Sequence, residues 1–388
     1  MSPKKLRDKF LPYGRQWIDD DDIQAVVDVL KSDYLTTGPK IAEFEQAFAE
    51  YVGAKYAVAV SNGTAALHAA AFVAGIHEGD EVITSPITFA ASANCVLYLG
   101  GRPIFADIDS KTYNIDPMEI RKQITPKTKA IIPVHFTGQP VDLDEVHSIA
   151  DKYHLVVIED AAHALGAEYK GKRIGGLSDM TIFSFHPVKQ ITTGEGGMVT
   201  TNNPDYYQKL LLFRTHGITR DKTLLLQNEG DWYYEQQELG FNYRMTDFQA
   251  ALGLSQLKKV DMFLKRRREL ADIYNQSLQN IPGVLLPYQT PNCNSSWHLY
   301  VIQIGDEAVR SRREVYDGLK KANIGVNVHY IPVYFHPYYQ ALGYPKGLCP
   351  NAETYYQRAL TLPLFPGMSE RDALEVVEIL KEILEDKI

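Results

Sequence analysis

Short apolar segments recur along the first half of the chain, and polar and apolar residues do not alternate within them. They cover residues 56–60, 81–84, 103–107, 130–134 and 155–158. Stretches with the apolar spacing of helices lie between several of them, as at 41–52, 90–99 and 143–153. A strand that is apolar on both sides must be buried on both faces, as in a parallel sheet covered by helices. We therefore expect an α/β fold with a mostly parallel central sheet.

The pattern changes after residue 257, where a long charged helix is expected over 257–278. We interpret its basic run, Lys265 to Arg268, as a solvated helical face. Further on, the expected elements are strands at 297–304 and 325–330 and helices at 312–321 and 370–383. Because 388 residues are too many for one compact core, we predict a large domain at 1–258 and a smaller C-terminal α+β domain at 259–388.

Composition excludes several classes of partner. A formal net charge of −8 disfavours nucleic acid, which calls for a basic face. The N-terminus has no apolar signal-peptide region, and no run of about 18 apolar residues predicts a membrane span. Cys95, Cys293 and Cys349 form no CxxC pair and no plausible disulfide framework. We expect a cytoplasmic protein without a metal site and without nucleic-acid or membrane partners.

An anion site is indicated where the strand at 56–60 is followed by Ser-Asn-Gly-Thr-Ala at 61–65. Backbone N–H groups at a helix start, with small side chains around them, bind phosphate well. Gly63, Thr64 and Ala65 are the candidates, although an ordinary capped helix has the same appearance. Phe89, after the strand at 81–84, either stacks on a flat cofactor or belongs to the core.

Two adjacent carboxylates end the buried strand near residue 158, at the sheet edge where α/β proteins bind ligands. Since side chains alternate along a strand, we expect Asp160 to face the site and Glu159 to face away. A carboxylate at this edge can hold a cationic nitrogen such as that of a protonated pyridine. His163 either packs over the ring of such a ligand or fills the core.

Lys189 ends an apolar segment, 181–189, and glycines follow it at 194, 196 and 197. A lone lysine after a strand is normally a solvated surface residue. This one lies between a buried strand and glycines that allow a close approach of other backbone. Its amine can form an imine, as lysines do with pyridoxal phosphate, and Ser184 can donate to the phosphate. An anion loop, an aromatic ring, an acid and a lysine in this order predict a pyridoxal-phosphate site.

The motifs also show a family resemblance. They are LTTGP at 35–39, SNGTAAL at 61–67, DEVIT at 80–84, EDAAH at 159–163, FSFHPVK at 183–189 and GFNYR at 240–244. In order and spacing they resemble the DegT/DnrJ/EryC1/StrS sugar aminotransferases, which have the fold of fold-type I pyridoxal-phosphate enzymes (aspartate-aminotransferase-like). The resemblance extends nearly from end to end, from Leu11 to the last helix. A related branch that has histidine in place of Lys189 performs deoxygenation, so the lysine favours transamination.

The resemblance implies a role for each matching position. Lys189 would carry the cofactor as a Schiff base, and Asp160 would pair with its pyridine nitrogen. The other implied cofactor contacts are Phe89 on the ring, Gly63, Thr64, Ala65 and Ser184 at the phosphate, and His163 beside the cofactor. Asn242 would reach the cofactor phosphate of a neighbouring subunit, which implies a homodimer. The implied substrate contacts are Tyr13, Asp33, Tyr34, Leu35, Thr36, His329, Tyr330 and Tyr334.

Segments 186–197, 295–300 and 325–330 resemble one branch more narrowly, the transaminases of pseudaminic acid biosynthesis. Their substrate is a UDP-4-keto-6-deoxy-N-acetylhexosamine, which is aminated at C4 to UDP-4-amino-4,6-dideoxy-N-acetyl-β-L-altrosamine. L-glutamate is the implied amino donor. Another nucleotide 4-keto sugar, such as UDP-4-keto-L-arabinose, is the alternative substrate. Arg214 and Arg244 are candidates for the glutamate carboxylate, or else structural ion-pair partners.

The sequence is also compatible with two other classes of protein. One is a pyridoxal-phosphate lyase or dehydratase on the same fold. The other is a non-catalytic regulatory homologue, against which the presence of both Lys189 and Asp160 argues.

Overall fold

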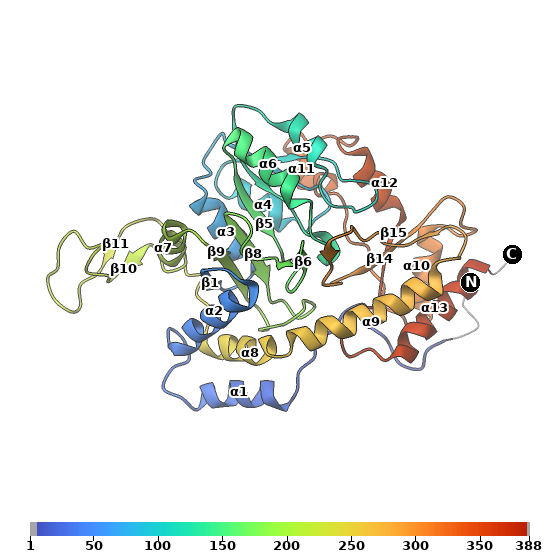
Figure 1. Ribbon diagram of the computed structural model, residues 1–388, viewed down its shortest axis with the longest axis horizontal. Coiled ribbons are helices and arrows are strands. Elements are labelled where there is room, and N and C mark those ends of the chain that lie inside the picture. Colours follow the sequence, from blue (N-terminus) through green and yellow to red (C-terminus); the bar gives the residue numbers. More distant parts are fainter. Residues whose placement is uncertain (1–5, 386–388) are drawn as a thin grey trace.

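The computed structural model describes residues 6–385 and is built around a seven-stranded sheet with the order β1-β9-β8-β5-β4-β2-β3 (Figure 1). The strands are β1 (Tyr56–Val60), β2 (Glu81–Thr84), β3 (Arg102–Phe105), β4 (Thr128–Ile132), β5 (Val156–Asp160), β8 (Met180–Ser184) and β9 (Gly197–Thr201). Neighbours from β8 to β3 pair in parallel, whereas β9 is antiparallel to both β1 and β8. The expected α/β fold with a mostly parallel sheet is confirmed.

Both faces of this sheet are buried, as non-alternating strands require. Within β1, Ala57 and Ala59 belong to one core, and Val58 and Val60 belong to the other. The first core receives α2 (Pro39–Val52), α5 (Pro117–Gln123), α6 (Leu143–Tyr153) and α8 (Asp247–Leu257). The second receives α3 (Gly63–Val73), α4 (Ala91–Leu97) and α7 (Pro204–Phe213). α1 (Asp20–Leu30) packs against α8 and starts with a capping box formed by Asp19 and Asp22.

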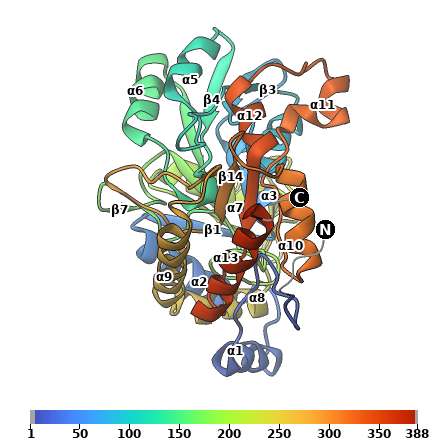
Figure 2. The ribbon, with the colours of Figure 1, turned by 90° about the vertical axis from the view of Figure 1, so that its right-hand side faces the viewer.

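A second unit is formed by the C-terminal part of the chain around the antiparallel sheet β12-β14-β15. Its elements are β12 (Val284–Leu285), β14 (Tyr300–Ile304), α10 (Arg312–Lys321), α11 (Pro337–Ala341), α12 (Pro350–Arg358), β15 (Ala359–Leu362) and α13 (Glu370–Glu385). Figure 2 looks onto this unit, with α13 turned toward the viewer. No helix within residues 6–385 is long and apolar enough to cross a membrane.

The long helix α9 (Val260–Leu278) joins the two units. Phe263 and Leu264 in its first half belong to the core of the large sheet, whereas Leu270 and Tyr274 belong to the second core. The helix is therefore shared, and the boundary near residue 258 stays a prediction.

The expected solvated face of α9 is wrong for Arg267, which is fully buried. Its Nη1 donates to the carbonyl oxygens of three residues. These are Trp297, His298 and Leu364. A buried guanidinium needs such acceptors, and they come from distant segments that a helical charge pattern does not reveal. Lys265, by contrast, is exposed.

The strand expected at 325–330 is also wrong, because these residues belong to no strand of the described chain. Asn327 and Thr361 alone pair there, exchanging backbone hydrogen bonds of 3.3 and 2.8 Å. The following His329 instead uses its Nδ1 to contact the Thr361 hydroxyl at 2.8 Å. The segment runs along a cavity wall rather than extending the sheet.

An arm with two short strands, β10 (Ile218–Thr219) and β11 (Glu235–Gln236), projects from the body at the left of Figure 1. Three of its large apolar side chains are strongly exposed: Leu226 at 91%, Trp232 at 71% and Leu239 at 76%. Single exposed apolar residues are ordinary, but several together on a projecting arm indicate a contact surface.

Phe48 of α2 tests how much the first core contributes to stability. Its ring lies 5.0 Å from the ring of Phe183 and 5.4 Å from that of Phe185 between centroids. We expect Phe48→Ala to lower the free energy of unfolding by about 3–5 kcal/mol, since it leaves a cavity among these rings. Val309→Ala, at a position that is 69% exposed and lies outside the arm, should change it by less than about 0.5 kcal/mol. Urea unfolding followed by circular dichroism measures both, and equal losses would contradict the prediction.

Candidate active site

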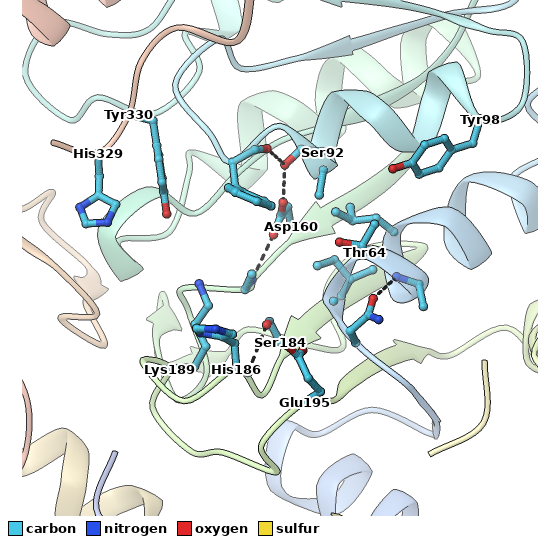
Figure 3. A pocket seen from close by; sticks show the side chains of 18 of the residues that line it. Thr64, Ser92, Tyr98, Asp160, Ser184, His186, Lys189, Glu195, His329 and Tyr330 are labelled. Carbon is cyan, nitrogen blue, oxygen red and sulfur yellow. Dashed lines mark hydrogen bonds between the residues drawn. The ribbon is translucent and has the colours of Figure 1, made fainter. Parts of the chain in front are cut away.

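A cavity of about 740 Å³ opens at the carboxyl ends of β5 and β8 (Figure 3). Ten of the residues predicted from sequence line it: Tyr13, Gly63, Thr64, Ala65, Phe89, Asp160, Ser184, Lys189, His329 and Tyr330. They come from the N-terminal segment, the large sheet and the second unit, so the cavity lies where the three meet.

The anion-binding side of the cavity is the start of α3. Asn62 caps this helix, and its side-chain oxygen accepts a 2.8 Å hydrogen bond from the Ala65 N–H. A Cβ atom on Gly63 would lie 3.0 Å from the Ser184 Cβ, so glycine lets the helix start approach the end of β8 closely. Helix N-termini carry partial positive charge, and with the Ser184 hydroxyl beside it this one suits a phosphate group.

Asp160 lies across the cavity, at the end of β5, and is only 5% exposed. One carboxylate oxygen accepts a 2.6 Å hydrogen bond from the Ser92 hydroxyl, and the other accepts a 3.1 Å bond from the Ala162 N–H. Burial raises the pKa of Asp160 in spite of these bonds. A buried carboxylate in this position gains much from a cationic partner, which a protonated pyridine nitrogen provides.

Lys189 extends from the loop after β8 toward the same space (Figure 3). Its backbone N–H closes a turn onto the His186 carbonyl at 2.9 Å. Burial lowers the pKa of the Lys189 amine to about 8, with a further lowering by Arg267, while Asp160 acts to raise it. A neutral amine is therefore available near neutral pH, as a nucleophile toward a carbonyl group requires.

The wall opposite these groups is formed by aromatic and imidazole side chains. The Tyr13 and His329 rings lie 5.4 Å apart between centroids, and the Tyr330 hydroxyl contacts the His163 Nε2 at 3.2 Å. Burial lowers the pKa of His329 to about 3, so the ring is neutral. His163 does not line the cavity but contacts Tyr330, which does, and burial holds the pKa of His163 well below the usual value.

Other predicted site residues do not meet at the cavity of this chain. Tyr334 is fully buried and donates to the Glu353 carboxylate at 2.7 Å. Asn242 is exposed, although the next residue, Tyr243, lines the cavity. The remaining predicted contacts, all exposed and away from the cavity, are Asp33, Tyr34, Leu35 and Thr36. Arg214 is an ion-pair partner of Glu45 and also donates to the Ala59 carbonyl at 2.7 Å.

The structure also adds residues that were not among the predicted contacts. Ser92 contacts Asp160, and Tyr98, His186 and Glu195 line the cavity. Ser92 lies inside a helix with ordinary composition, so only its contact with Asp160, 68 positions away, marks it. Within residues 6–385, no cluster of three or more His, Cys, Asp and Glu side chains is arranged to hold a metal ion.

These residues fit pyridoxal phosphate. The helix start and Ser184 would hold the phosphate, Asp160 the ring nitrogen, and Lys189 the aldehyde carbon. Gly63 leaves room for the phosphate group where any side chain would meet Ser184.

Comparison with known proteins agrees with this geometry. Residues 16–381 match the DegT/DnrJ/EryC1/StrS aminotransferase family. The chain belongs to this family. It is a pyridoxal-phosphate-dependent sugar aminotransferase, and the lyase and regulatory alternatives are therefore set aside.

Three similar proteins belong to the matches found. The spore coat polysaccharide biosynthesis protein SpsC of Bacillus subtilis is 45% identical over 97% of this chain and 98% of its own. PseC of Helicobacter pylori, an aminotransferase of pseudaminic acid biosynthesis, is 33% identical, with a TM-score of 0.91 over 97% of this chain and 100% of its own. The putative sugar aminotransferase Spr1654 of Streptococcus pneumoniae in its PMP form is 32% identical, with a TM-score of 0.92 over 97% and 99%.

The lowered pKa of Lys189 predicts how the protein without cofactor captures pyridoxal phosphate. Only the neutral amine attacks the aldehyde, so the rate should fall about tenfold per pH unit below 8 and level off above about 9. An ordinary lysine, with a pKa near 10.4, would give a rate still rising there. Stopped-flow absorbance of the cofactor measures the rate, with Lys189→Ala as the control for capture elsewhere. A rate that keeps rising beyond pH 10 would contradict the prediction.

Proposed function

We propose that this aminotransferase moves an amino group from L-glutamate to C4 of a UDP-4-keto-6-deoxy-N-acetylhexosamine, giving UDP-4-amino-4,6-dideoxy-N-acetyl-β-L-altrosamine. The observation that carries the proposal is the cavity itself, which joins Lys189 and Asp160 to the wall of Tyr13, His329 and Tyr330. Likeness to PseC over 97% of the chain supports the pseudaminic acid pathway.

In this proposal Lys189 acts twice. Its amine would hold the cofactor and, once released, would act as the general base that takes the proton from the amino donor's α-carbon and as the general acid that gives it back. Pyridoxal phosphate, when bound, would supply an acceptor for the electron pair of the C–H bond. Asp160 keeps the ring nitrogen protonated, which makes that acceptance favourable. The same steps in reverse place nitrogen on C4 of the sugar.

The wall beyond Lys189 would receive the sugar. Tyr330 is partly buried, and this burial raises the pKa of its hydroxyl above the usual value, so the hydroxyl keeps its proton and can donate to a sugar oxygen. The hydroxyl of Tyr13 likewise stays protonated, because burial raises its pKa. Uncharged donors of this kind suit hydroxyl and carbonyl groups better than a carboxylate.

A second substrate is favoured by a specific observation. SpsC, the relative at 45% identity, is named for spore coat polysaccharide biosynthesis rather than for pseudaminic acid. Another nucleotide 4-keto sugar is therefore the second candidate, with UDP-4-keto-L-arabinose as one example.

A panel of nucleotide 4-keto sugars distinguishes these substrates. The protein with pyridoxal phosphate and L-glutamate should aminate the UDP-N-acetyl-hexosulose most efficiently, and NMR of the product should show the altrosamine configuration. We expect Lys189→Ala to abolish turnover, by a factor of more than about 10³, because it removes the group that moves the proton. Preference for a different sugar would overturn the substrate, whereas activity retained by purified Lys189→Ala would overturn the mechanism.

We further propose that the enzyme is a homodimer with shared active sites, working in the cytoplasm. The exposed arm supports an interface between copies of the chain, and the exposed Asn242, next to the cavity-lining Tyr243, supports one near the cavity. In a dimer, the partner subunit's copy of segment 33–36 or of Asn242 would complete a cavity that these residues do not reach within one chain. All three cysteines are free, which fits a reducing compartment.

Mixing two inactive variants tests the shared site. If Asn242 acts in the partner's site, a heterodimer of Lys189→Ala with Asn242→Ala contains one site with both residues intact. Co-refolding the two variants should then restore about a quarter of wild-type activity, since half of the dimers are mixed and each has one good site. Analytical ultracentrifugation measures the oligomeric state, which we expect to be a dimer. No gain over the separate variants would contradict shared sites.

A further inference from the structure

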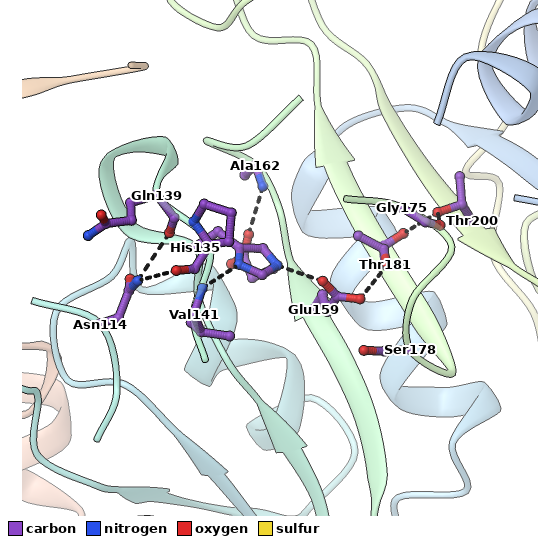
Figure 4. A network of polar contacts seen from close by, with 12 residues as sticks. Asn114, His135, Gln139, Val141, Glu159, Ala162, Gly175, Ser178, Thr181 and Thr200 are labelled. Carbon is purple, nitrogen blue, oxygen red and sulfur yellow. Dashed lines mark hydrogen bonds and ion pairs between the residues drawn. The ribbon is translucent and has the colours of Figure 1, made fainter. Parts of the chain in front are cut away.

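Behind the catalytic face of β5 lies a polar network that the proposed mechanism does not use (Figure 4). Glu159 and His135 are both fully buried, and the His135 Nε2 lies 2.7 Å from the Glu159 Oε2. The hydroxyl of Thr181 on β8 donates to the other carboxylate oxygen at 3.2 Å. Glu159 thus points away from the cavity, as expected from sequence.

The hydrogen bonds assign the protonation state of His135. Its Nδ1 accepts a 3.1 Å hydrogen bond from the Val141 N–H, so that nitrogen carries no proton. The proton is then on Nε2, which donates to Glu159. A neutral imidazole beside a carboxylate leaves the pair with one net negative charge.

Glu159 is ionised in this setting. Burial is the strongest single influence and acts to raise its pKa, but His135, Ser178 and His147 together hold the pKa below its usual value. His147 of α6 is a further basic side chain that acts on Glu159, and its Nε2 contacts the Ser178 hydroxyl at 2.7 Å.

His135 links Glu159 to the backbone of Asp160. Asp160 donates its N–H to the Pro133 carbonyl at 2.8 Å, and its own carbonyl accepts from the His135 N–H at 3.1 Å. His135 therefore holds the backbone of Asp160 and the side chain of Glu159 at once. One peptide separates the two carboxylates, and both are buried, with Glu159 at 0% and Asp160 at 5% exposure, so bulk solvent screens their interaction little.

We propose that Glu159, paired with His135, is a positioning residue that acts through Asp160 to keep the cofactor's ring nitrogen protonated. The role rests on the proposed function of Asp160. Glu159 contacts neither cofactor nor substrate. It supplies a fixed negative charge behind Asp160, which makes a positive charge on the cavity side more favourable, and its bond to His135 fixes the end of β5.

Glu159→Gln removes the negative charge with little change in the shape of the side chain, because the amide oxygen still accepts the hydrogen bond from His135. The readout is the ¹⁵N NMR signal of pyridoxal phosphate labelled at its ring nitrogen in the holoenzyme, followed against pH. We expect the pKa of the ring nitrogen to fall by about one unit in the variant, a tenfold change in the protonation constant. We also expect kcat to fall while KM for the amino acceptor stays within about twofold.

Glu45→Gln is the matched control. Glu45 is likewise a hydrogen-bonded carboxylate, which accepts from the Ala59 N–H at 2.8 Å and pairs with Arg214, but it does not contact the Asp160 network. Glu45→Gln should lower the thermal unfolding midpoint of the protein and leave the pKa of the cofactor's ring nitrogen unchanged. If Glu159→Gln does not fold, the double variant His135→Phe/Glu159→Leu removes the charge with an apolar pair of similar bulk.

An unchanged ring-nitrogen pKa in a folded charge-removing variant would overturn the proposal and leave Glu159 with a structural role only. That failure is separate from failure of the proposed function, which would appear as no conversion of the wild-type cofactor to pyridoxamine phosphate by glutamate.

Discussion

The parallel pairing of β5 with β8 is the constraint on which the site depends. Its register sets Asp160 opposite Ile182, so the carboxylate at the end of β5 lies beside the chain that continues through Ser184 to Lys189. Parallel strands bring their carboxyl ends to one edge, and a buried parallel sheet cannot slip without exposing apolar side chains. The core therefore fixes Asp160 and the end of β8, and the loop that starts there carries Lys189.

Burial that makes the sheet stable also makes its edge reactive. It lowers the pKa of Lys189 to about 8 and raises the pKa of Asp160, so each group gains from a cofactor that complements it. The same low polarity demands partners for every other polar group. Ser92 serves Asp160, and His135 serves Glu159 on the opposite face. Stability and chemistry at this edge thus draw on one set of hydrogen bonds.

Local patterns predicted much of the fold because they depend on near neighbours. The strand at 56–60 and the helices at 143–153 and 312–321 have the expected bounds. Prediction failed where contacts with distant segments determine the structure. At 325–330, a single bridge between Asn327 and Thr361 replaces the expected strand. At Arg267, the carbonyl oxygens of three distant residues accept hydrogen bonds from a buried guanidinium. The predicted contacts at 33–36 and Asn242 do not line the cavity of their own chain. We therefore propose that they complete the cavity of the partner subunit in a dimer.

By itself, the sequence determined the class of sheet, the order of its strands along the chain, and the residue types that suit pyridoxal phosphate, with lysine at position 189. Apolar runs and small residues at a helix start leave few other solutions. Only the tertiary structure decided that Ser92 supports Asp160, that Tyr13 and His329 share a wall, and that Glu159 and His135 form a neutral-imidazole pair behind the site. These contacts join residues between 24 and 316 positions apart. Local sequence patterns do not predict such contacts, because the packing of the core brings the residues together.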